Sequence, residues 1–590
     1  MGGRRKRSTL SALDLLTSSI QTAWSSKRGC VVSMLSLDIS GAYDHVSTKR
    51  LLWILRNKGF PEWIIKYVQS FMQGRRTKVA FDGYESNWIQ TDAGIPQGSP
   101  ISPILFLFFI SELLEGVQDV KESKLGFGFV DDTNLITWGA SAKENCERLE
   151  EAHKRCIDWS RRHGSKFTPD KYKLMHFTRR KRDPRGDLAS TVKIEGFTEE
   201  IKPETKLRVL GVWMDPKMNW KEHIKVAIGK GTAAFEALSR IAASTWGPCM
   251  QRSKLLYTAI VRPAMVYGAQ AWYTGPNGKQ TKSNLTQLEL IQNKCLRRIT
   301  GGYKRTPRAA MEREAKVQPL DLYCDTLTMN RALKDRGSKV KEEIKRTVDE
   351  IWETGQQLSQ GSQRHRGSQR EARQRPPTGA EHVLQRAIER EQEIHAYQAW
   401  LAQRPRRARR PRANRPPPGQ PQKVKTAIDE WADLEWERRW RQKARKGKAT
   451  IWRTPWQQNT MKLYSDMPKH QATALFLLRT EVIGLNGWLA SISVPGIKPE
   501  CGCGWPTQSV HHVLMMCPLY TASREQLVSR MDSEEMWRML STPEKAQATA
   551  RWFVQQGILQ QFNLAKEIEE EDTGNHASFK PLEGALQDFP

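Results

Sequence analysis

Two adjacent aspartates, Asp131 and Asp132, stand in the middle of the apolar stretch LGFGFVDDTNLIT, residues 125–137. The aromatic residues Phe127 and Phe129 are two positions apart, which is the side-chain spacing of a β-strand. Neighbouring carboxylates repel each other, and burial between apolar strands increases that cost. The pair therefore needs a compensating partner such as a cation, unless it is simply the polar tip of a hairpin, where Asp, Thr and Asn are common.

A large excess of basic residues limits the classes of function that the chain can serve. Among 590 residues, 94 are Lys or Arg and 64 are Asp or Glu, which gives a formal net charge of +30. Such a surplus predicts binding to a polyanion, either nucleic acid or an anionic membrane face. The longest apolar run, residues 104–110, is too short to span a bilayer, and the N-terminus contains no hydrophobic signal core. Nine cysteines, an odd number, do not indicate a disulfide framework, so we expect an intracellular protein that is neither secreted nor membrane-embedded.

A third aspartate, Asp38, follows another apolar, strand-like run, residues 31–37, in the segment VSMLSLDISGAYDHV. Two strands that carry acids at their ends can bring three carboxylates to one point, where divalent cations offset their repulsion. Mg²⁺ prefers oxygen ligands and binds through one or two carboxylates together with substrate phosphates. Two such ions about 3.5–4 Å apart are the arrangement that polymerases and nucleases use for in-line phosphoryl transfer. The sequence therefore favours a two-metal site built from Asp38, Asp131 and Asp132.

The order of three motifs resembles a known enzyme family, because AGIPQGSPISP, residues 93–103, lies between the two acidic segments. The chain is similar to the reverse transcriptases of non-LTR (LINE-type) retrotransposons over roughly residues 4–325 and again over about residues 470–525. The resemblance implies an RNA-directed DNA polymerase that extends a primer 3′-hydroxyl in target-primed reverse transcription. It implies that Asp38, Asp131 and Asp132 are catalytic. It also implies that Asp38 and Asp131 hold two Mg²⁺ ions, which Mn²⁺ could replace.

The resemblance also assigns roles to residues around the three aspartates. Tyr43, five residues after Asp38, would lie under the incoming sugar and exclude a 2′-hydroxyl by its bulk, with ordinary packing as the alternative. Gln97 would border the nucleotide pocket, and Gly98 would allow the backbone to approach the nascent base pair. The segment FTPDKYKLMHF resembles the family's Asn-Pro-x-Lys motif, although threonine replaces the asparagine. Lys171 is therefore the candidate cation beside the triphosphate, with an ordinary surface lysine as the alternative.

A compact group of cysteines and histidines lies near the C-terminus, in CGCGWPTQSVHHVLMMC. Cys501, Cys503, Cys517 and one histidine would supply the four ligands of a structural Zn²⁺ site. The family carries a Cys-x-Cys and His-x-x-x-x-Cys knuckle near this end, and that spacing favours His512 over His511. Four protein ligands would close the site, which would make it structural rather than catalytic. Its use would be to grip template RNA or target DNA. The alternative is a set of reduced, buried cysteines without metal.

Strands interspersed with helices, without strict alternation, predict an α+β fold for the first part of the chain. The resemblance implies a right-hand polymerase palm, an antiparallel sheet with helices, together with partial fingers and a helical thumb. A disordered linker and a small helical C-terminal region with the zinc knuckle would follow. The expected boundaries are partial fingers over 1–37, palm over 38–224, thumb and following helices over 225–335, basic linker over 336–425, C-terminal region over 426–535 with the knuckle at 501–517, and a helical segment with an acidic tail over 536–590.

Local signals refine this division. Asp44 is a candidate cap for a helix that starts near Ser47. Ser141 with Glu144 predicts a capping box at the start of another helix, which Gly164 would end. Asp82-Gly83 predicts the turn of a hairpin between these helices. Gln-, Arg- and Pro-rich segments after about Thr354 predict disorder, interrupted by a helical patch over about 382–401. Two basic blocks, Arg404–Arg415 and Arg438–Lys448, predict phosphate binding, and the first also resembles a nuclear-import signal.

The chain begins at MGGRRKRST, which resembles a segment inside the fingers of the family. We therefore expect a truncated chain that lacks the preceding fingers strands and the upstream endonuclease. Besides an active polymerase, this leaves open a catalytically inactive nucleic-acid-binding remnant. A nuclease of RNase H type is a weaker alternative, because the Pro-Gln-Gly segment and the Asp-Asp hairpin argue against it. The expected partners are an RNA template, a DNA primer or target and deoxynucleoside triphosphates, in the nucleus after a cytoplasmic ribonucleoprotein stage.

Overall fold

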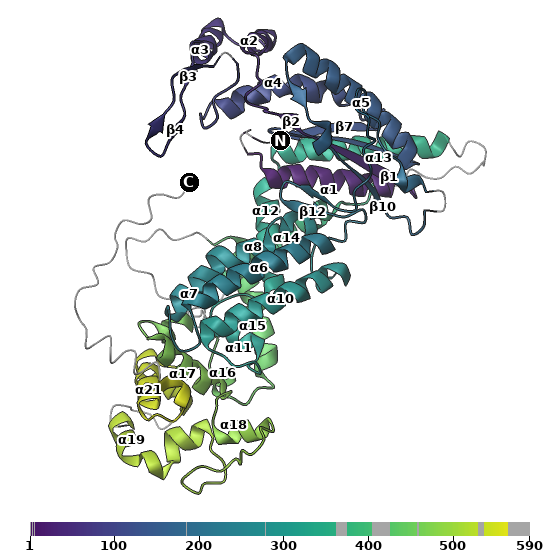
Figure 1. Ribbon diagram of the computed structural model, residues 1–590. Coiled ribbons are helices and arrows are strands. Elements are labelled where there is room, and N and C mark those ends of the chain that lie inside the picture. The colour runs from purple at the N-terminus through teal and green to yellow at the C-terminus, as the bar shows by residue number, and fades with distance from the viewer. Residues whose placement is uncertain are drawn as a thin grey trace. The chain divides into compact units, whose positions relative to one another are not determined.

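The computed structural model describes residues 2–563 apart from residues 3, 5, 92, 184–185, 278, 362–373, 404–424, 457–459 and 529–535 (Figure 1). The chain divides into two compact units, and each unit draws on three separate segments. Unit 1 takes residues 1–225, 268–284 and 327–413, and unit 2 takes residues 226–267, 285–326 and 414–590. The basic block Arg404–Arg415 and the acidic tail lie outside the described residues.

Unit 1 is built on an antiparallel four-stranded sheet with strand order β10-β1-β8-β7. Its strands are β1 (Val31–Leu37), β7 (Lys124–Phe129), β8 (Asp132–Gly139) and β10 (Lys173–Thr178). In the register of β1 against β8, Leu37 pairs with Thr133. The C-terminal end of β1 and the N-terminal end of β8 therefore lie at the same edge of the sheet, which confirms the mixed helix-and-sheet fold expected of a polymerase palm.

Helices cover both faces of this sheet (Figure 1). Helix α1 (Thr9–Ser26) packs on one face, where Trp24 Nε1 donates a hydrogen bond to the carbonyl of Phe177 at 3.2 Å. Helices α4 (Ser102–Val117) and α5 (Ala142–His163) pack on the other face. Because both faces are covered, six of the seven residues of β1 are buried, which explains why its sequence VVSMLSL does not alternate between polar and apolar residues.

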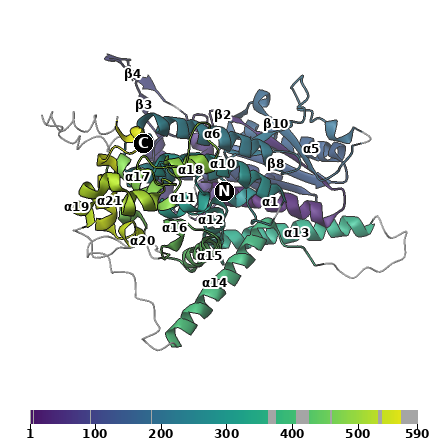
Figure 2. The same ribbon diagram turned by 90° about the horizontal axis from the view of Figure 1, so that it is seen from below.

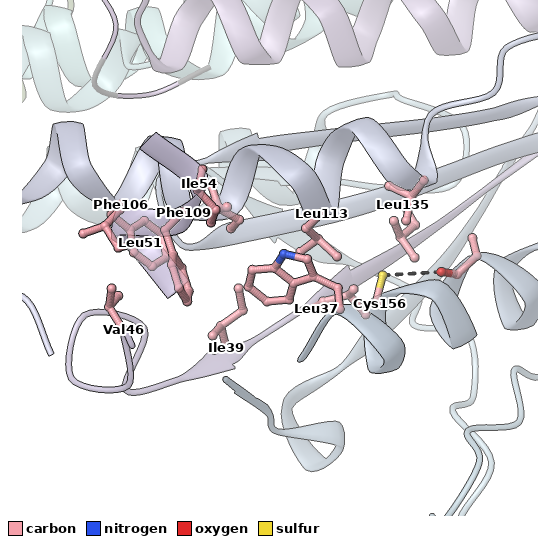
Figure 3. Packing of buried hydrophobic residues seen from close by; sticks show 14 of the residues in the cluster. Leu37, Ile39, Val46, Leu51, Ile54, Phe106, Phe109, Leu113, Leu135 and Cys156 are labelled. Carbon is pink, nitrogen blue, oxygen red and sulfur yellow. Dashed lines mark hydrogen bonds between the residues drawn. The ribbon is translucent and has the colours of Figure 1, made fainter. Parts of the chain in front are cut away.

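Figure 3 shows part of the core between the sheet and helices α4 and α5. This core also includes residues of two further helices, α2 (Thr48–Asn57) and α3 (Glu62–Met72). Phe109 lies at its centre, with its ring 5.6 Å from that of Trp159 in an edge-to-face contact. The cap of α2 differs from the prediction. Ser47 Oγ accepts the hydrogen bond from Arg50 N, whereas Asp44 is three residues too early to reach the first turn and contacts Gln97 instead.

Helix α5 begins and ends where the sequence predicts. Ser141 Oγ accepts a hydrogen bond from Glu144 N at 3.2 Å, and Gly164 ends the helix in the left-handed conformation, with φ 70°. The reciprocal half of the predicted capping box is absent, because Glu144 Oε1 instead accepts a hydrogen bond from Arg148 Nη2 at 2.5 Å.

Short strand pairs complete unit 1. A ribbon leaves the unit between α3 and α4 and turns at Asp82 and Gly83, which both have positive φ, as the Asp-Gly pair predicts. The pairs are β2 (Ile39–Ser40) with β9 (Lys166–Phe167), β3 (Arg76–Thr77) with β6 (Ile89–Gln90), β4 (Ala80–Phe81) with β5 (Tyr84–Glu85), and β11 (Leu207–Val209) with β12 (Val212–Met214).

The chain after the sheet is helical, and none of the described helices is both long and apolar enough to cross a lipid bilayer. Its α-helices are α6 (Lys221–Ile241), α7 (Met250–Leu256), α8 (Arg262–Val266), α9 (Ala269–Trp272), α10 (Lys279–Thr300), α11 (Arg308–Glu314), α12 (Leu320–Asp335), α13 (Lys339–Gly361), α14 (Gly379–Gln403), α15 (Ala427–Ala444), α16 (Thr450–Arg453), α17 (Lys469–Thr480), α18 (Asn486–Ser491), α19 (Thr521–Val528), α20 (Met536–Met539) and α21 (Pro543–Gln555). Single turns of 3₁₀ or π type are η1 (Pro169–Lys171), η2 (Asp187–Ala189), η3 (Tyr257–Val261), η5 (Thr460–Tyr464), η6 (His512–Met516), η7 (Pro518–Tyr520) and η8 (Gln560–Phe562).

The prediction of a largely disordered linker over 336–425 is too broad. Helix α13 packs along α1, and α14 follows it in the same unit (Figures 1 and 2). Val340, Ile344, Val348 and Ile351 are buried at helical spacing and give α13 an apolar stripe. The high content of Gln, Arg and Lys hid this stripe, because composition averages over the faces of a helix.

The centre of unit 2 contains a buried ionic group. Arg479 Nε donates to Glu314 Oε2 at 2.9 Å, and neither side chain is exposed. The hydroxyl of Tyr464 donates to the same carboxylate. A second arginine, Arg313, stacks on Trp440 with 4.5 Å between Cζ and the ring centroid, so every buried charge of this group has a partner.

We expect Phe109→Ala to destabilise unit 1 by about 3–5 kcal/mol, because it removes a fully buried ring and leaves a cavity beneath the sheet. Urea unfolding followed by tryptophan fluorescence measures the change. The matched control is Phe81→Ala, since Phe81 lies on the ribbon with 77% of its surface exposed. The control should change stability by less than about 0.5 kcal/mol. Equal effects of the two substitutions would contradict this description of the core.

Candidate active site and metal centre

The sheet brings the three predicted acidic residues to one edge. Asp38 directly follows β1, Asp132 is the first residue of β8, and Asp131 lies in the turn between β7 and β8. The turn is tight: Phe129 pairs with Asp132, and Val130 adopts a positive φ of 62°, which is unusual for a β-branched residue. Because Leu37 is paired with Thr133, Asp38 leaves the sheet beside Asp132.

The three carboxylates interact electrostatically. Burial raises the pKa of the Asp132 carboxyl, and the negative charges of Asp131 and Asp38 raise it further. Burial also raises the pKa of the Tyr43 hydroxyl, with a further contribution from the charge of Asp131. The site is thus a partly exposed patch of negative charge in which Asp38 and Asp131 make Asp132 harder to ionise.

A lysine already contacts this patch. Lys171 Nζ donates to Asp38 Oδ2 at 3.1 Å, with 64% of the lysine side chain and 40% of the aspartate side chain exposed. The 3₁₀ turn η1 carries Lys171 to this position, because Thr168 N donates to the carbonyl of Asp38 at 3.0 Å. The structure thereby brings together two residues, Asp38 and Lys171, that are 133 positions apart.

The segment GIPQGSPISP forms a loop that is bound to the chain after Asp38. Ile95 N donates to the carbonyl of Tyr43 at 2.7 Å. Gly94, with φ 90°, lies so close to Asp44 that a Cβ atom there would stand 2.7 Å from the Asp44 carbonyl oxygen. Gln97 Nε2 donates to Asp44 Oδ1 at 3.4 Å, so the loop and the chain after Asp38 form one rim of the site.

Gly98 occupies the exposed tip of this loop. Its φ of 91° is a conformation that other residues rarely adopt, and nothing lies within 4 Å of the place where a Cβ atom would stand. Backbone strain, rather than contact inside the protein, therefore accounts for glycine at this position.

Sequence reasoning missed the residue that orients Tyr43. The Tyr43 ring stacks on Phe106, with centroids 5.0 Å apart and planes inclined by 12°. Phe106 is buried in α4, four residues after Ser102, whose hydroxyl donates to the carbonyl of Pro96 at 2.6 Å. The helical spacing from the loop motif to Phe106 was a signal that could have identified it.

The four C-terminal side chains also come together. The ligand atoms of Cys501, Cys503, His512 and Cys517 all lie within 4.8 Å of one another. The sulfur atoms of Cys501 and Cys517 are 3.8 Å apart, and Cys503 Sγ is 3.2 Å from His512 Nε2. His511, the rejected alternative, is exposed and is not in the group.

Two local structures build this cluster. Gly504, with φ 88°, donates to the carbonyl of Cys501 at 2.9 Å and closes a tight turn around the first two cysteines. The π-type turn η6 then joins the last two ligands, since Cys517 N donates to the carbonyl of His512 at 2.8 Å. The ring of Trp505 stacks on the imidazole at 5.4 Å and holds it in place.

The donor set fits a tetrahedral zinc ion. Sulfur ligands about 2.3 Å from zinc stand about 3.8 Å apart in a tetrahedron, and the two sulfurs of Cys501 and Cys517 have that separation. Within the described chain, no other group of three or more potential ligands is similarly compact. The three aspartates interact but do not form a closed ligand set, and Lys171 holds one of them.

Comparison with known proteins identifies the sheet-containing part of the chain. Residues 2–214 match the family described as "Reverse transcriptase (RNA-dependent DNA polymerase)". A protein named "RNA-directed DNA polymerase from mobile element jockey", from Drosophila melanogaster, is 29% identical over 296 residues, which cover 48% of this chain and 30% of the relative. The "Probable RNA-directed DNA polymerase from transposon BS" of the same species is 24% identical over 303 residues, which cover 51% of this chain and 32% of the relative.

These alignments set the extent of the relationship. The chain spans about a third of the length of the curated relatives it matches. The solved structure of telomerase from Candida tropicalis with a fragment of telomeric RNA aligns with 58% of this chain and 53% of that chain, at 13% identity. Its TM-score of 0.30 is too low to carry an argument. Residues 2–214 form a reverse transcriptase domain of the type found in LINE-like, non-LTR retrotransposons.

Proposed function

We propose that this chain catalyses RNA-directed DNA synthesis, adding deoxynucleotides to a primer 3′-hydroxyl on an RNA template. The observation that carries the proposal is the register of β1 against β8, which sets Asp38 beside the Asp131-Asp132 turn. In this proposal the sheet of unit 1 is the polymerase palm, and the helices after residue 225 include a thumb. The electrostatic interaction of the three acids supports a site that takes cations.

Asp38 and Asp131 would hold two Mg²⁺ ions, with Asp132 as a supporting acid. Carboxylate oxygens are the donors that Mg²⁺ prefers, and uncompensated negative charge at this edge fits a divalent cation. When bound, such ions lower the pKa of the attacking hydroxyl and stabilise charge on the leaving pyrophosphate. The exposed ammonium of Lys171 would neutralise Asp38 in place of a metal ion until substrate arrives. It would then turn to the triphosphate.

The rim residues would position the nucleotide. Tyr43, held flat against Phe106, would stand under the sugar and clash with a 2′-hydroxyl. Gln97, anchored on Asp44, would border the base, and the exposed backbone at Gly98 would let the new base pair approach. These contacts fix the geometry of the reacting groups, which is the protein's main share of phosphoryl transfer.

The proposed partners are an RNA template, a DNA target that supplies the primer, and deoxynucleoside triphosphates, in target-primed reverse transcription. Because such a reaction needs chromosomal DNA, we place the chain in the nucleus, and exclusion of the tagged full chain from nuclei in microscopy would contradict this. A catalytically inactive remnant is not favoured, since the named relatives are polymerases and the aspartates of the site are present.

The C-terminal cluster would hold one structural Zn²⁺. Cys501, Cys503, His512 and Cys517 supply four soft or borderline donors at tetrahedral spacing, and they leave no open position for a substrate. The metal would tie the turn at Gly504 to η6, and the surface formed in this way would contact template RNA or target DNA.

We expect Asp131→Asn to lower primer extension on an RNA template by about 10²–10³-fold, because it removes a charge that acts on the reacting groups. Asp158→Asn is the matched control, since Asp158 is an exposed aspartate of α5 outside the site, and it should keep full activity. Equal incorporation by wild type and Asp131→Asn would exclude this carboxylate as a metal ligand. If no variant incorporates nucleotides while all bind RNA, the inactive remnant is the better description.

Asp132→Asn should stabilise the protein at neutral pH although it impairs activity. The pKa of Asp132 is raised on folding, so its ionisation opposes folding. This cost in folding free energy is absent well below the ordinary aspartate pKa of about 3.9. It grows as the pH rises from that value to the raised pKa of Asp132 in the folded protein, and it is complete above it. The melting temperature of Asp132→Asn is therefore expected to exceed that of wild type at pH 7 and to match it near pH 3. A melting temperature of Asp132→Asn below that of wild type at pH 7 would contradict the repulsion of Asp132 by Asp131 and Asp38.

Substitution of the two neighbouring histidines separates the metal site from the alternative of buried cysteines without metal. Purified wild type should contain one zinc per chain by elemental mass spectrometry. His512→Ala should lose it, whereas His511→Ala, one residue away and exposed, should retain it. The melting temperature should fall with the zinc content. Zinc absent from the wild type, or retained equally by both variants, would count against the site.

A further inference from the structure

An interrupted helix in unit 2 presents a cluster of basic residues. Helices α7 and α8 are continuous through the π-type turn η3, residues 257–261. Pro263 explains the interruption, since it lacks the N–H group that would bond to the carbonyl four residues earlier. An extra residue in one turn relieves this conflict, and such turns are common at functional sites. Lys254 lies before the π turn, and Arg262 lies directly after it.

Arg262 is fixed in position without an acidic partner. Its Cζ atom lies 3.8 Å from the centroid of the Tyr323 ring, so the guanidinium is stacked on an aromatic face. Its Nε is buried and has no hydrogen-bond partner. A stacked guanidinium keeps its outer N–H groups in one plane, where they can bind a phosphate through two hydrogen bonds.

Lys316 completes the cluster from the loop between α11 and α12. It is exposed and adopts a positive φ of 49°, with its N–H bonded to the carbonyl of Arg313 at 3.0 Å. The loop is held by Gln292, whose Nε2 donates to the carbonyl of Gln318 and whose Oε1 accepts from the Tyr257 hydroxyl at 2.7 Å. The strained backbone of Lys316 is therefore supported by the same π turn that separates the other two cations.

Lys254 is repelled by the other two cations. Burial, together with the positive charges of Lys316 and Arg262, lowers the pKa of the Lys254 ammonium to about 8. Partial burial also lowers the pKa of the Lys316 ammonium. The negative charge of Asp433 opposes this decrease, and the positive charge of Lys425 adds to it. Asp433 is itself bonded to Lys425 at 2.5 Å. Among the described residues, no carboxylate forms an ion pair with Lys254, Arg262 or Lys316.

We propose that Lys254, Arg262 and Lys316 form a binding site for backbone phosphates of a nucleic-acid strand. A stacked guanidinium and two ammonium groups, none of them in an ion pair with a carboxylate of the described residues, are chemistry that suits a phosphodiester. The site deepens the proposed function, because it gives the nucleic acid a second attachment, which lies in unit 2. It does not depend on catalysis.

The test uses the double variant Lys254→Gln/Lys316→Gln of the full chain. Binding of a fluorescein-labelled single-stranded RNA oligonucleotide is measured by anisotropy over a range of salt concentrations, with EDTA present and without nucleotides. Each phosphate contact contributes about 0.7 to the magnitude of the slope of log Kobs against log[salt]. The slope of the double variant should therefore be smaller in magnitude by about 1.4. Lys254→Arg/Lys316→Arg should keep the wild-type slope. An unchanged slope in the double glutamine variant would overturn the proposal.

A control variant separates the site from the general charge of the protein. Lys230→Gln/Arg240→Gln removes two charges from exposed positions of α6 in the same unit and should leave the slope nearly unchanged. An equal loss in this control would show that total charge, not the cluster, binds RNA. Because the two lysines repel each other, their replacement should not lower the melting temperature, and a fall would overturn the proposal by showing that they stabilise the fold.

Two further arms identify the ligand. Inorganic phosphate, compared with chloride at equal ionic strength, should not displace RNA selectively from the wild type. Selective displacement that disappears in the double variant would assign the cluster to free phosphate and overturn the assignment to a strand. Asp131→Asn should bind RNA with the wild-type slope. A wild-type chain that binds RNA with this slope but extends no primer would therefore contradict only the proposed function.

Discussion

The antiparallel pairing of β1 with β8 is the interaction on which the acidic site depends. It sets Leu37 opposite Thr133, so that Asp38 and Asp132 leave the sheet at one edge. Backbone hydrogen bonds and burial on both faces hold this register against the repulsion that raises the pKa of Asp132. A slip of one residue would turn every inward side chain of β1 outward. The hydrophobic core therefore also determines where the acids meet.

Charge compensation distinguishes the structural ionic groups from the proposed binding sites. The buried carboxylate of Glu314 is neutralised by Arg479 and accepts a hydrogen bond from the Tyr464 hydroxyl, which is what a buried charge needs if it is to stabilise a fold. The edge of the sheet in unit 1 has an excess of acid that a single exposed lysine only partly offsets. The cluster at Lys254 in unit 2 has the opposite excess. Each excess of like charge lowers the stability of the fold. A cation bound at the acidic edge, or a polyanion bound at the basic cluster, would restore that stability.

Local signals in the sequence were reliable where a single residue type has one physical use. The turn at Asp82-Gly83 and the end of α5 at Gly164 are as predicted, because both need a positive φ. Prediction failed where several residues compete for one task. Asp44 is a good helix cap by type, but Ser47 has the right position in the chain, and the buried stripe of α13 is concealed by its polar faces. Composition describes a whole segment, whereas packing depends on one face of it.

The sequence by itself indicated the family of residues 2–214 and the four side chains of the C-terminal cluster, because each rests on residue types at short, fixed spacings. Only the tertiary structure decided which distant residues meet. Lys171 on Asp38, Phe106 beneath Tyr43 and Lys316 near Lys254 come from separate elements. Their encounter depends on strand register and helix packing, which the whole core sets and which no local pattern encodes.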